Sequence, residues 1–125
     1  MGEQGAITMD GIPFDIQKHG MFSGCWTLNH EGQEVASAQK STAFTRTFEI
    51  QDPSGELVLR AESALGRSFR LERSGDVIAT VRPDHAFTRR ASIEILTKQW
   101  DLPTVYFSFW LVVLMWRRAA QSNNG

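Results

Sequence analysis

The chain has 125 residues, the usual size of one domain, and we expect a single domain over residues 1–120. Hydrophobic residues make up 42% and charged residues 22%, which is the composition of an ordinary folded domain and excludes a disordered or collagen-like chain. The formal net charge is −1 with the basic residues spread out, so no overall positive field favours nucleic acid as a partner.

Cysteine content and the terminal segments bear on the compartment. Cys25 is the only cysteine, so an internal disulfide is excluded and a reducing cytoplasm fits best. The first residues contain neither a basic region nor an apolar run, which predicts no secretory signal peptide. We therefore expect a cytoplasmic protein, with residues 121–125 as a disordered tail.

Before Trp100, apolar and polar residues alternate with a period of two, which is typical of strands with one apolar face. Ile12, Phe14 and Ile16 share one side, and the pattern recurs at 43–50, 56–61, 69–75 and 89–95. Turn signals separate these segments at 10–11, 30–32, 52–55, 74–76 and 82–84. The pattern predicts about eight to ten strands joined as a meander of hairpins.

Three of these hairpins share one form, in which an aromatic residue is followed by an aliphatic residue, a turn ending in glycine and an apolar strand. They are "CWTLNHEGQEVASA", "TFEIQDPSGELVLRA" and "SFRLERSGDVIATV", with aromatics Trp26, Phe48 and Phe69 and glycines Gly32, Gly55 and Gly75. One interpretation is that any up-and-down sheet looks like this. The other is a barrel or rolled sheet built by repeating one hairpin.

After Trp100 the alternation stops, and "DLPTVYFSFWLVVLMWRR" predicts one helix over about Pro103–Ala119, capped by Asp101. The helix is apolar all round, so it is either buried or inserted in a membrane. Its apolar run of about 22 Å is short for a membrane core of about 30 Å, so burial is the favoured interpretation and a tail anchor or interfacial helix the alternative. The expected core residues of the helix are Val105, Tyr106, Phe109, Trp110, Val113 and Trp116.

No catalytic constellation is evident. His19, His30 and His85 lie far apart without the spacing of a metal site, and Cys25 at the start of an apolar strand fits a small core residue better than a nucleophile. No nucleotide-binding or nucleophile-elbow motif is present. The expectation is a protein that is not an enzyme and uses no metal or cofactor.

The one cluster that suggests a ligand is basic. Arg67, Arg70 and Arg73 alternate with apolar residues, and Arg89 and Arg90 lie in a neighbouring candidate strand. Guanidinium groups on adjacent strands suit phosphate oxygens. The alternative is a solvated strand face that Glu62, Glu72 and Glu94 neutralise.

The sequence predicts a many-stranded meander of hairpins such as "FRLERSGDVIATV", followed by the terminal helix "DLPTVYFSFWLVVLMWRR". This order of elements resembles the tubby C-terminal-like superfamily, which includes the LURP-one-related proteins and the phospholipid scramblases. The resemblance implies a mainly β fold, an antiparallel meander rolled into a barrel around one C-terminal hydrophobic helix. The family's barrel has more strands in a longer chain, so an incomplete barrel is expected, or a second copy covering the open side. The family also binds lipid head groups, although no motif here carries over specific ligand residues.

Two function hypotheses follow. The first is a non-enzymatic module that binds an anionic lipid or head group, peripheral to the membrane face. The second is a structural or protein–protein interaction domain without a small ligand, which forms a homodimer through the open side of the sheet.

Overall fold

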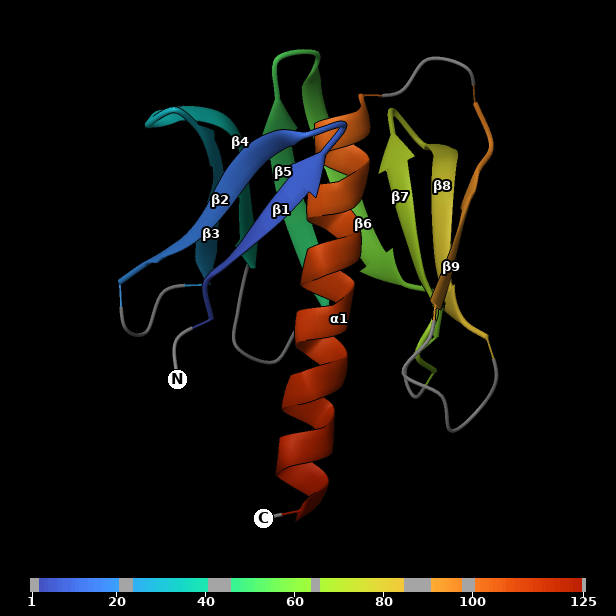
Figure 1. Cartoon of the computed structure of the whole chain (residues 1–125). Coiled ribbons are helices and arrows are strands. Elements are labelled where there is room, and N and C mark those ends of the chain that lie inside the picture. The colour runs from blue at the N-terminus through green and yellow to red at the C-terminus, as the bar shows by residue number, and fades with distance from the viewer. Residues whose placement is uncertain are drawn as a thin grey trace. The chain divides into compact units, whose positions relative to one another are not determined.

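The computed structural model describes residues 3–20, 24–40, 46–63, 66–84, 91–97 and 101–124 (Figure 1). It contains nine strands and one helix. The strands are β1 (Gly5–Met9), β2 (Ile12–His19), β3 (Cys25–His30), β4 (Gln33–Lys40), β5 (Thr47–Asp52), β6 (Gly55–Ala61), β7 (Phe69–Arg73), β8 (Asp76–Pro83) and β9 (Ala91–Ile95). The helix is α1 (Leu102–Asn124). The strands pair as antiparallel neighbours in chain order, β1 to β9, in one sheet that is not closed. This confirms the mainly β meander with one C-terminal helix.

Two-residue turns reverse the chain where the sequence predicts it. Asp10–Gly11, Glu31–Gly32 and Ser74–Gly75 each combine two positive φ angles, the conformation that suits the right-handed twist of a hairpin. The turn expected at residues 82–84 is wrong at its first two positions, because β8 continues through Pro83, which pairs with Ala91. Proline is tolerated there since its missing N–H falls at the end of the ladder.

The chain divides into two compact units, residues 1–58 and 59–125, with the boundary inside β6. Each unit is described by itself. The expectation of one domain over residues 1–120 stays a prediction.

In the first unit, one face of β1 to β5 and of the start of β6 carries the core. Its buried apolar residues are Met9, Ile16, Trp26, Leu28, Ala36, Ala38, Phe48, Ile50 and Leu57. Trp26 and Phe48 meet edge to face with ring centroids 5.6 Å apart. The indole Nε1 of Trp26 donates to the carbonyl oxygen of Glu3 at 3.1 Å, so the residue preceding β1 is tied to the core. Of the apolar side that the alternation predicted for residues 12–16, Ile16 is buried, Phe14 is half-buried and Ile12, at the start of β2, is 46% exposed.

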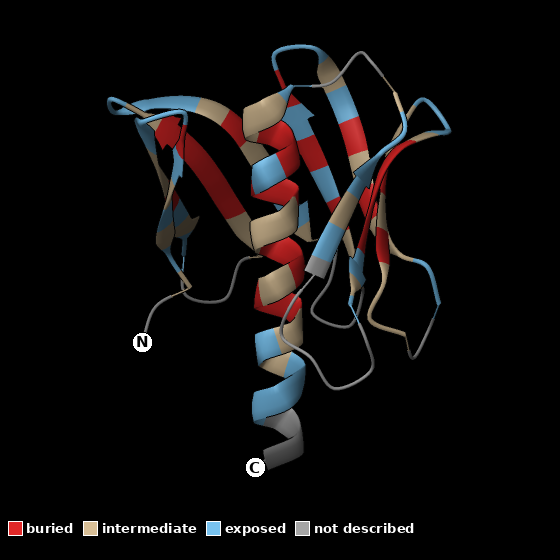
Figure 2. Cartoon of the chain, turned by 45° about the vertical axis from the view of Figure 1, so that its right-hand side comes forward, coloured by how far each residue is buried: buried red, intermediate tan, exposed pale blue. Residues whose placement is uncertain are grey.

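In the second unit, β7 and β8 provide buried Phe69, Leu71, Ala79 and Val81, and α1 contacts β8. The deepest helix residues are Phe107, Leu111 and Val112, each 0% exposed. Figure 2 shows buried residues along most of α1 and exposed residues towards its C-terminal end. Apolar burial on this scale is the main stabilising contribution that α1 can make.

Two of the three similar hairpins are equivalent in detail. Adding 43 to the residue numbers converts the β3–β4 pair Trp26↔Ala38 into the β7–β8 pair Phe69↔Val81, and the bulge after Leu28 into the bulge after Leu71. The same shift converts the β4–β5 register into the β8–β9 register. The repeat is therefore a three-stranded meander, β3–β4–β5 and β7–β8–β9. The β5–β6 hairpin differs, since its turn places Pro53 and Ser54 between the strands.

Helix α1 begins as predicted. The Oδ2 atom of Asp101 accepts hydrogen bonds from the backbone N of Thr104 at 3.4 Å and from its Oγ1 at 2.9 Å, which satisfies a free N–H of the first turn. The helix continues to Asn124, so residues 121–124, which were expected to form a disordered tail, are helical. Among the described residues, no helix is long and apolar enough to span a membrane.

Candidate functional site

Arg60, Arg70 and Glu72 lie on the side of the second unit's strands opposite the core. Arg70 and Glu72 alternate along β7 with buried Phe69 and Leu71, so they lie on the other face of the sheet. Thr80 on β8 is the direct neighbour of Arg70 on this face. The face is therefore polar, as the alternation predicted.

Arg60 on β6 lies directly opposite Arg70 on β7. The backbone N of Glu62 donates to the carbonyl oxygen of Ser68 at 2.9 Å, and this antiparallel register places Arg60 opposite Arg70. Two like charges directly opposite each other destabilise a sheet unless an opposite charge lies between them. A counter-charge is thus required at this position of the β6–β7 ladder.

Glu72 supplies that counter-charge. Its carboxylate lies 2.5 Å from Nε of Arg70 and 3.4 Å from Nε of Arg60, and its side chain is 13% exposed. Both Nε atoms are buried and form no hydrogen bond of good geometry among the described residues, so the contacts are ion pairs rather than aligned bonds. We call Arg60, Arg70 and Glu72 the arginine cluster.

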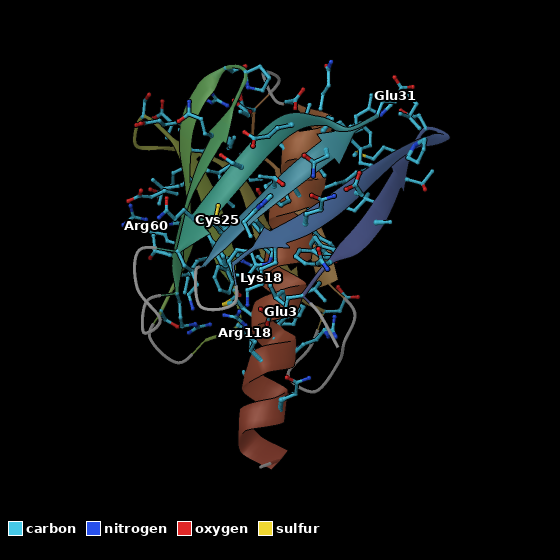
Figure 3. The ribbon with its side chains drawn as sticks, turned by 90° about the vertical axis from the view of Figure 1, so that its left-hand side faces the viewer. Glu3, Lys18, Cys25, Glu31, Arg60 and Arg118 are labelled. Atoms are coloured by element: carbon cyan, nitrogen blue, oxygen red, sulfur yellow. The ribbon has the colours of Figure 1, made fainter. Side chains whose placement is uncertain are left out.

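The arginine cluster carries an excess positive charge, since one carboxylate faces two guanidinium groups. The side chains of Arg60 and Arg70 remain 43% and 41% exposed, and Figure 3 shows Arg60 projecting away from α1. Arg82, further along the same face, forms its own pair with Glu62 at 3.5 Å. Within the cluster, the excess charge belongs to Arg60 and Arg70. The exposed residue Glu94 on β9 lies on the same face, beyond Thr80.

The five predicted arginines are not all placed together. The Arg67 guanidinium lies 4.6 Å from the ring centroid of Trp116, and its carbonyl oxygen accepts the indole N–H at 2.8 Å, so Arg67 belongs to the helix side. Arg73 is half-buried and follows Phe69 and Leu71 at the two-residue spacing of the core side. Arg89 and Arg90 lie outside the described residues. Of the predicted set, Arg70 alone is seen in the arginine cluster.

Arg60 was missed as a ligand residue because strand alternation gives its face but not its neighbour. Its pairing with Arg70 depends on the register between Glu62 and Ser68, which lie too far apart in sequence for a two-residue turn signal to define it. The usable signal was the pair of arginines on outward positions of two consecutive candidate strands.

A concave feature lies on the outward face of the first unit. It is a groove of about 450 Å³, lined by Ser37, Gln39, Glu49, Ile50, Gln51, Glu56, Leu57 and Val58. Its charged lining residues are two glutamates, and no described lysine or arginine lines it. The groove therefore does not suit an anion.

Cys25 lies on the same outward face, directly opposite His19. Burial, and secondly the negative charge of Glu34, raise the pKa of the Cys25 thiol, which disfavours the nucleophilic thiolate. His19 Nε2 is 2.7 Å from Oγ1 of Thr27, which also accepts from Nδ2 of Asn29 at 3.1 Å. In the described part of the chain, no three His, Cys, Asp or Glu side chains are grouped to hold a metal.

Of the six helix residues expected in the core, one is buried, one is exposed and four are half-buried. Val105 is buried, whereas Tyr106 is 38% exposed. The other four are half-buried: Phe109, Trp110, Val113 and Trp116. Thr104 and Ser108, the polar residues of the apolar run, are instead buried, and Oγ of Ser108 donates to the carbonyl oxygen of Thr104 at 2.9 Å. The helix thus has a deeply buried face and a half-exposed aromatic one.

Among the described residues of the second unit, the arginine cluster and the half-exposed face of α1 are the surface features with which we associate a partner. Comparison with known proteins adds no relative: no family model, no curated protein and no solved structure matches the chain. The tubby-like assignment stays a prediction based on the order of the strands and the C-terminal helix.

Proposed function

We propose that this chain is a non-enzymatic module that binds an anionic head group through Arg60 and Arg70. The observation that carries the proposal is the arginine cluster, in which two opposed guanidinium groups share one carboxylate. A phosphate group would contribute the second negative charge that the cluster lacks. Planar guanidinium groups bind phosphate oxygens in a fork, so both exposed side chains can contact one phosphate.

The repeat supports the proposal, because the same meander is built without these charges in the first unit. Subtracting 43 from Arg70 and Glu72 gives Thr27 and Asn29, which are joined by a neutral hydrogen bond. Arg60 corresponds in the same way to Gln17, the neighbour of Thr27 on β2. The hairpin fold therefore does not require charge at these three positions, and another role for them is favoured.

A local cluster is also consistent with the overall charge. With a net charge of −1, the chain has no general attraction to an anionic surface, so binding must depend on particular residues. Exposed ion pairs are screened by salt over about 10 Å at 0.1 M. Binding to a lipid phosphate at a membrane face should therefore weaken with ionic strength.

The experiment measures co-flotation with vesicles of phosphatidylcholine alone and with phosphatidic acid added, in low and high salt. Wild type is expected to float only with the anionic vesicles at low salt. Arg60→Gln and Arg70→Gln should each weaken binding by at least about tenfold, since a hydrogen bond to a charged group contributes about 1.5–3 kcal/mol. Arg117→Gln removes the same charge from an exposed helix position and is the matched control.

The variant Glu72→Gln tests whether the arginine cluster is a binding site or only a structural group of ion pairs. It leaves Arg60 and Arg70 opposed without a counter-charge, so the variant should be less stable, bind anionic vesicles more tightly and regain thermal stability when inorganic phosphate is added. Phosphate protection without vesicle binding would identify a soluble phosphate compound as the ligand. If Glu72→Gln neither gains binding nor responds to phosphate, the arginine cluster is only structural and the proposal fails.

A further inference from the structure

The half-exposed residues of α1 follow a regular spacing. Between Thr104 and Trp116, every residue is buried except Tyr106, Phe109, Trp110, Val113 and Trp116. Leu102, before them, is half-buried, and Ala120, after them, is exposed. Six of these residues are separated alternately by four and three positions: Leu102, Tyr106, Phe109, Val113, Trp116 and Ala120. We call these six residues the heptad stripe.

Alternating steps of four and three residues are the seam of a coiled coil, in which apolar side chains of one helix pack between those of another. Such steps mark one face of any helix, and the outer face of a helix that only covers its own sheet is normally polar. Here all six residues on that face are apolar or aromatic. Large aromatic side chains that stay partly exposed on a helix mark a contact with another apolar surface. The spacing indicates that this surface is itself a helix.

We propose that a second copy of this chain docks on the heptad stripe, with the two α1 helices antiparallel. The stripe is symmetric about the level of Leu111, so a two-fold axis at this level brings Tyr106 beside Trp116 of the second copy. The same axis brings Phe109 beside Val113 of the second copy. A two-fold contact of this kind uses one patch twice and closes after two chains.

The charges at the two ends of α1 complement each other in this arrangement. Asp101 is exposed at the N-terminal end, and Arg117 is exposed beside Trp116. Around the proposed axis, Arg117 of the second copy lies about one helical turn, or roughly 6 Å, along the axis from the level of Asp101. A parallel pair would instead place the two Arg117 side chains together. Charge therefore favours the antiparallel pair and a second copy as the occupant.

The first test is sedimentation velocity from about 1 to about 100 µM. Wild type is expected to dimerise within this range, because a contact of modest area gives weak association. Tyr106→Lys should raise the dimer dissociation constant at least tenfold, because it places a charge in the apolar seam. Leu96→Lys, which makes the same change at an apolar residue 51% exposed and outside the stripe, is the matched control. Circular dichroism checks that both variants fold.

The second test fixes the orientation by cross-linking in a Cys25→Ser background. Trp110→Cys lies next to the proposed axis and should form covalent dimers with a short bismaleimide. Arg117→Cys should not, because six residues on each side of the axis separate the two thiols by about 18 Å along the helices. Cross-linking at position 117 but not at 110 would overturn the antiparallel arrangement.

Two further outcomes would overturn the proposal as a whole. One is a monomer at every concentration, with Tyr106→Lys sedimenting like wild type. The other is a monomer that floats with neutral phosphatidylcholine vesicles and loses this property in Tyr106→Lys, which would make lipid the occupant of the stripe. Neither outcome decides anion binding by Arg60 and Arg70, because that binding is measured by the additional flotation that phosphatidic acid produces and that Arg60→Gln and Arg70→Gln should lose.

Discussion

Lys18 is a charged residue on the apolar side of the first unit. It is paired with Trp26 across β2 and β3, and its Nζ lies 5.7 Å from the indole ring centroid. The same Nζ lies 2.8 Å from Oε1 of Glu3, with both side chains less than a quarter exposed. The ring face and the carboxylate together replace the water that the ammonium loses. The position of Lys18 thus has a local cause in Glu3 and Trp26.

Cys25 should react slowly in the folded protein near neutral pH. Its pKa is raised by burial and by Glu34, so the folded thiol holds its proton at pH values where the unfolded thiol begins to lose it. Alkylation by iodoacetamide at about pH 8 is expected to be several-fold slower in the native chain than in urea. Glu34→Gln should narrow this difference, whereas Glu31→Gln, an exposed turn residue, should not.

The same pKa difference has a defined effect on stability. Below the pKa of the unfolded thiol, both states carry the proton and the contribution is fully present. As the pH rises above that value, the unfolded state loses its proton first, so the free energy of unfolding falls. Cys25→Ser should remove this component from the alkaline decline. An unchanged decline in that variant would contradict the assignment.

At the scale of elements, the repeated meander is defined by its turns. Gly32 and Gly75 have φ angles of 79° and 87°, and a Cβ atom at either position would meet no atom within 4 Å. An alanine side chain would therefore fit at either position without a steric clash. The requirement for glycine comes from the left-handed backbone conformation, which costs an L-residue about 1 kcal/mol. Because the two hairpins share one register, the two glycines should be equivalent.

Gly32→Ala and Gly75→Ala are each expected to lower the free energy of unfolding by about 1 kcal/mol, measured by urea titration. Ser74→Gly, which relaxes a non-glycine residue at φ 53°, should leave stability unchanged or raise it. A large loss at only one of the two glycines would show that the hairpins are not energetically equivalent.

At the scale of the whole molecule, α1 contributes much of the buried apolar surface. Its buried hydrophobic residues are Val105, Phe107, Leu111, Val112, Leu114 and Met115. Burying each such side chain stabilises a protein by about 1.5–3 kcal/mol, so the set contributes on the order of 10 kcal/mol. This is comparable with the entire stability of a typical domain.

A chain that ends at Thr104 is therefore expected to lose cooperative unfolding and to aggregate, as measured by thermal denaturation and light scattering. A chain that ends at Arg118 is the control, since Ala119, Ala120 and Gln121 are exposed. Its melting temperature should be close to that of the full-length chain. If the chain ending at Thr104 folds cooperatively and stays monomeric, α1 is not part of the core and the anchor interpretation of the helix is favoured.

The sequence predicted the elements well, because each depends on a short-range pattern. Alternation predicted strands such as β7, with Phe69 and Leu71 buried and Arg70 and Glu72 on the other face. The loss of alternation after Trp100, with Asp101 as the cap, predicted α1. The C-terminal end of the helix was predicted less accurately, because residues 119–124 are helical although they have no strong apolar pattern.

The candidate site was predicted only in part, because it depends on register. The alternation of "FRLER" shows that Arg70 faces outward, but not which residue of the preceding strand lies beside it. That neighbour is Arg60, set by the backbone bond from Glu62 to Ser68. Arg67 has the same residue type and a similar sequence context, yet it packs on Trp116, 49 residues away. Such a contact has no local signal.

The sequence by itself therefore determined the class of fold, the positions of most turns and the apolar nature of the C-terminal helix. These follow from side-chain periods of 2 and 3.6 residues and from turn chemistry, which act over a few positions. The tertiary structure decided which arginines share Glu72, that β3–β5 and β7–β9 have one register, and which face of α1 stays partly exposed. These depend on how segments distant in sequence pair and pack. A shift of one residue in strand register would move every side chain of a strand to the opposite face of the sheet.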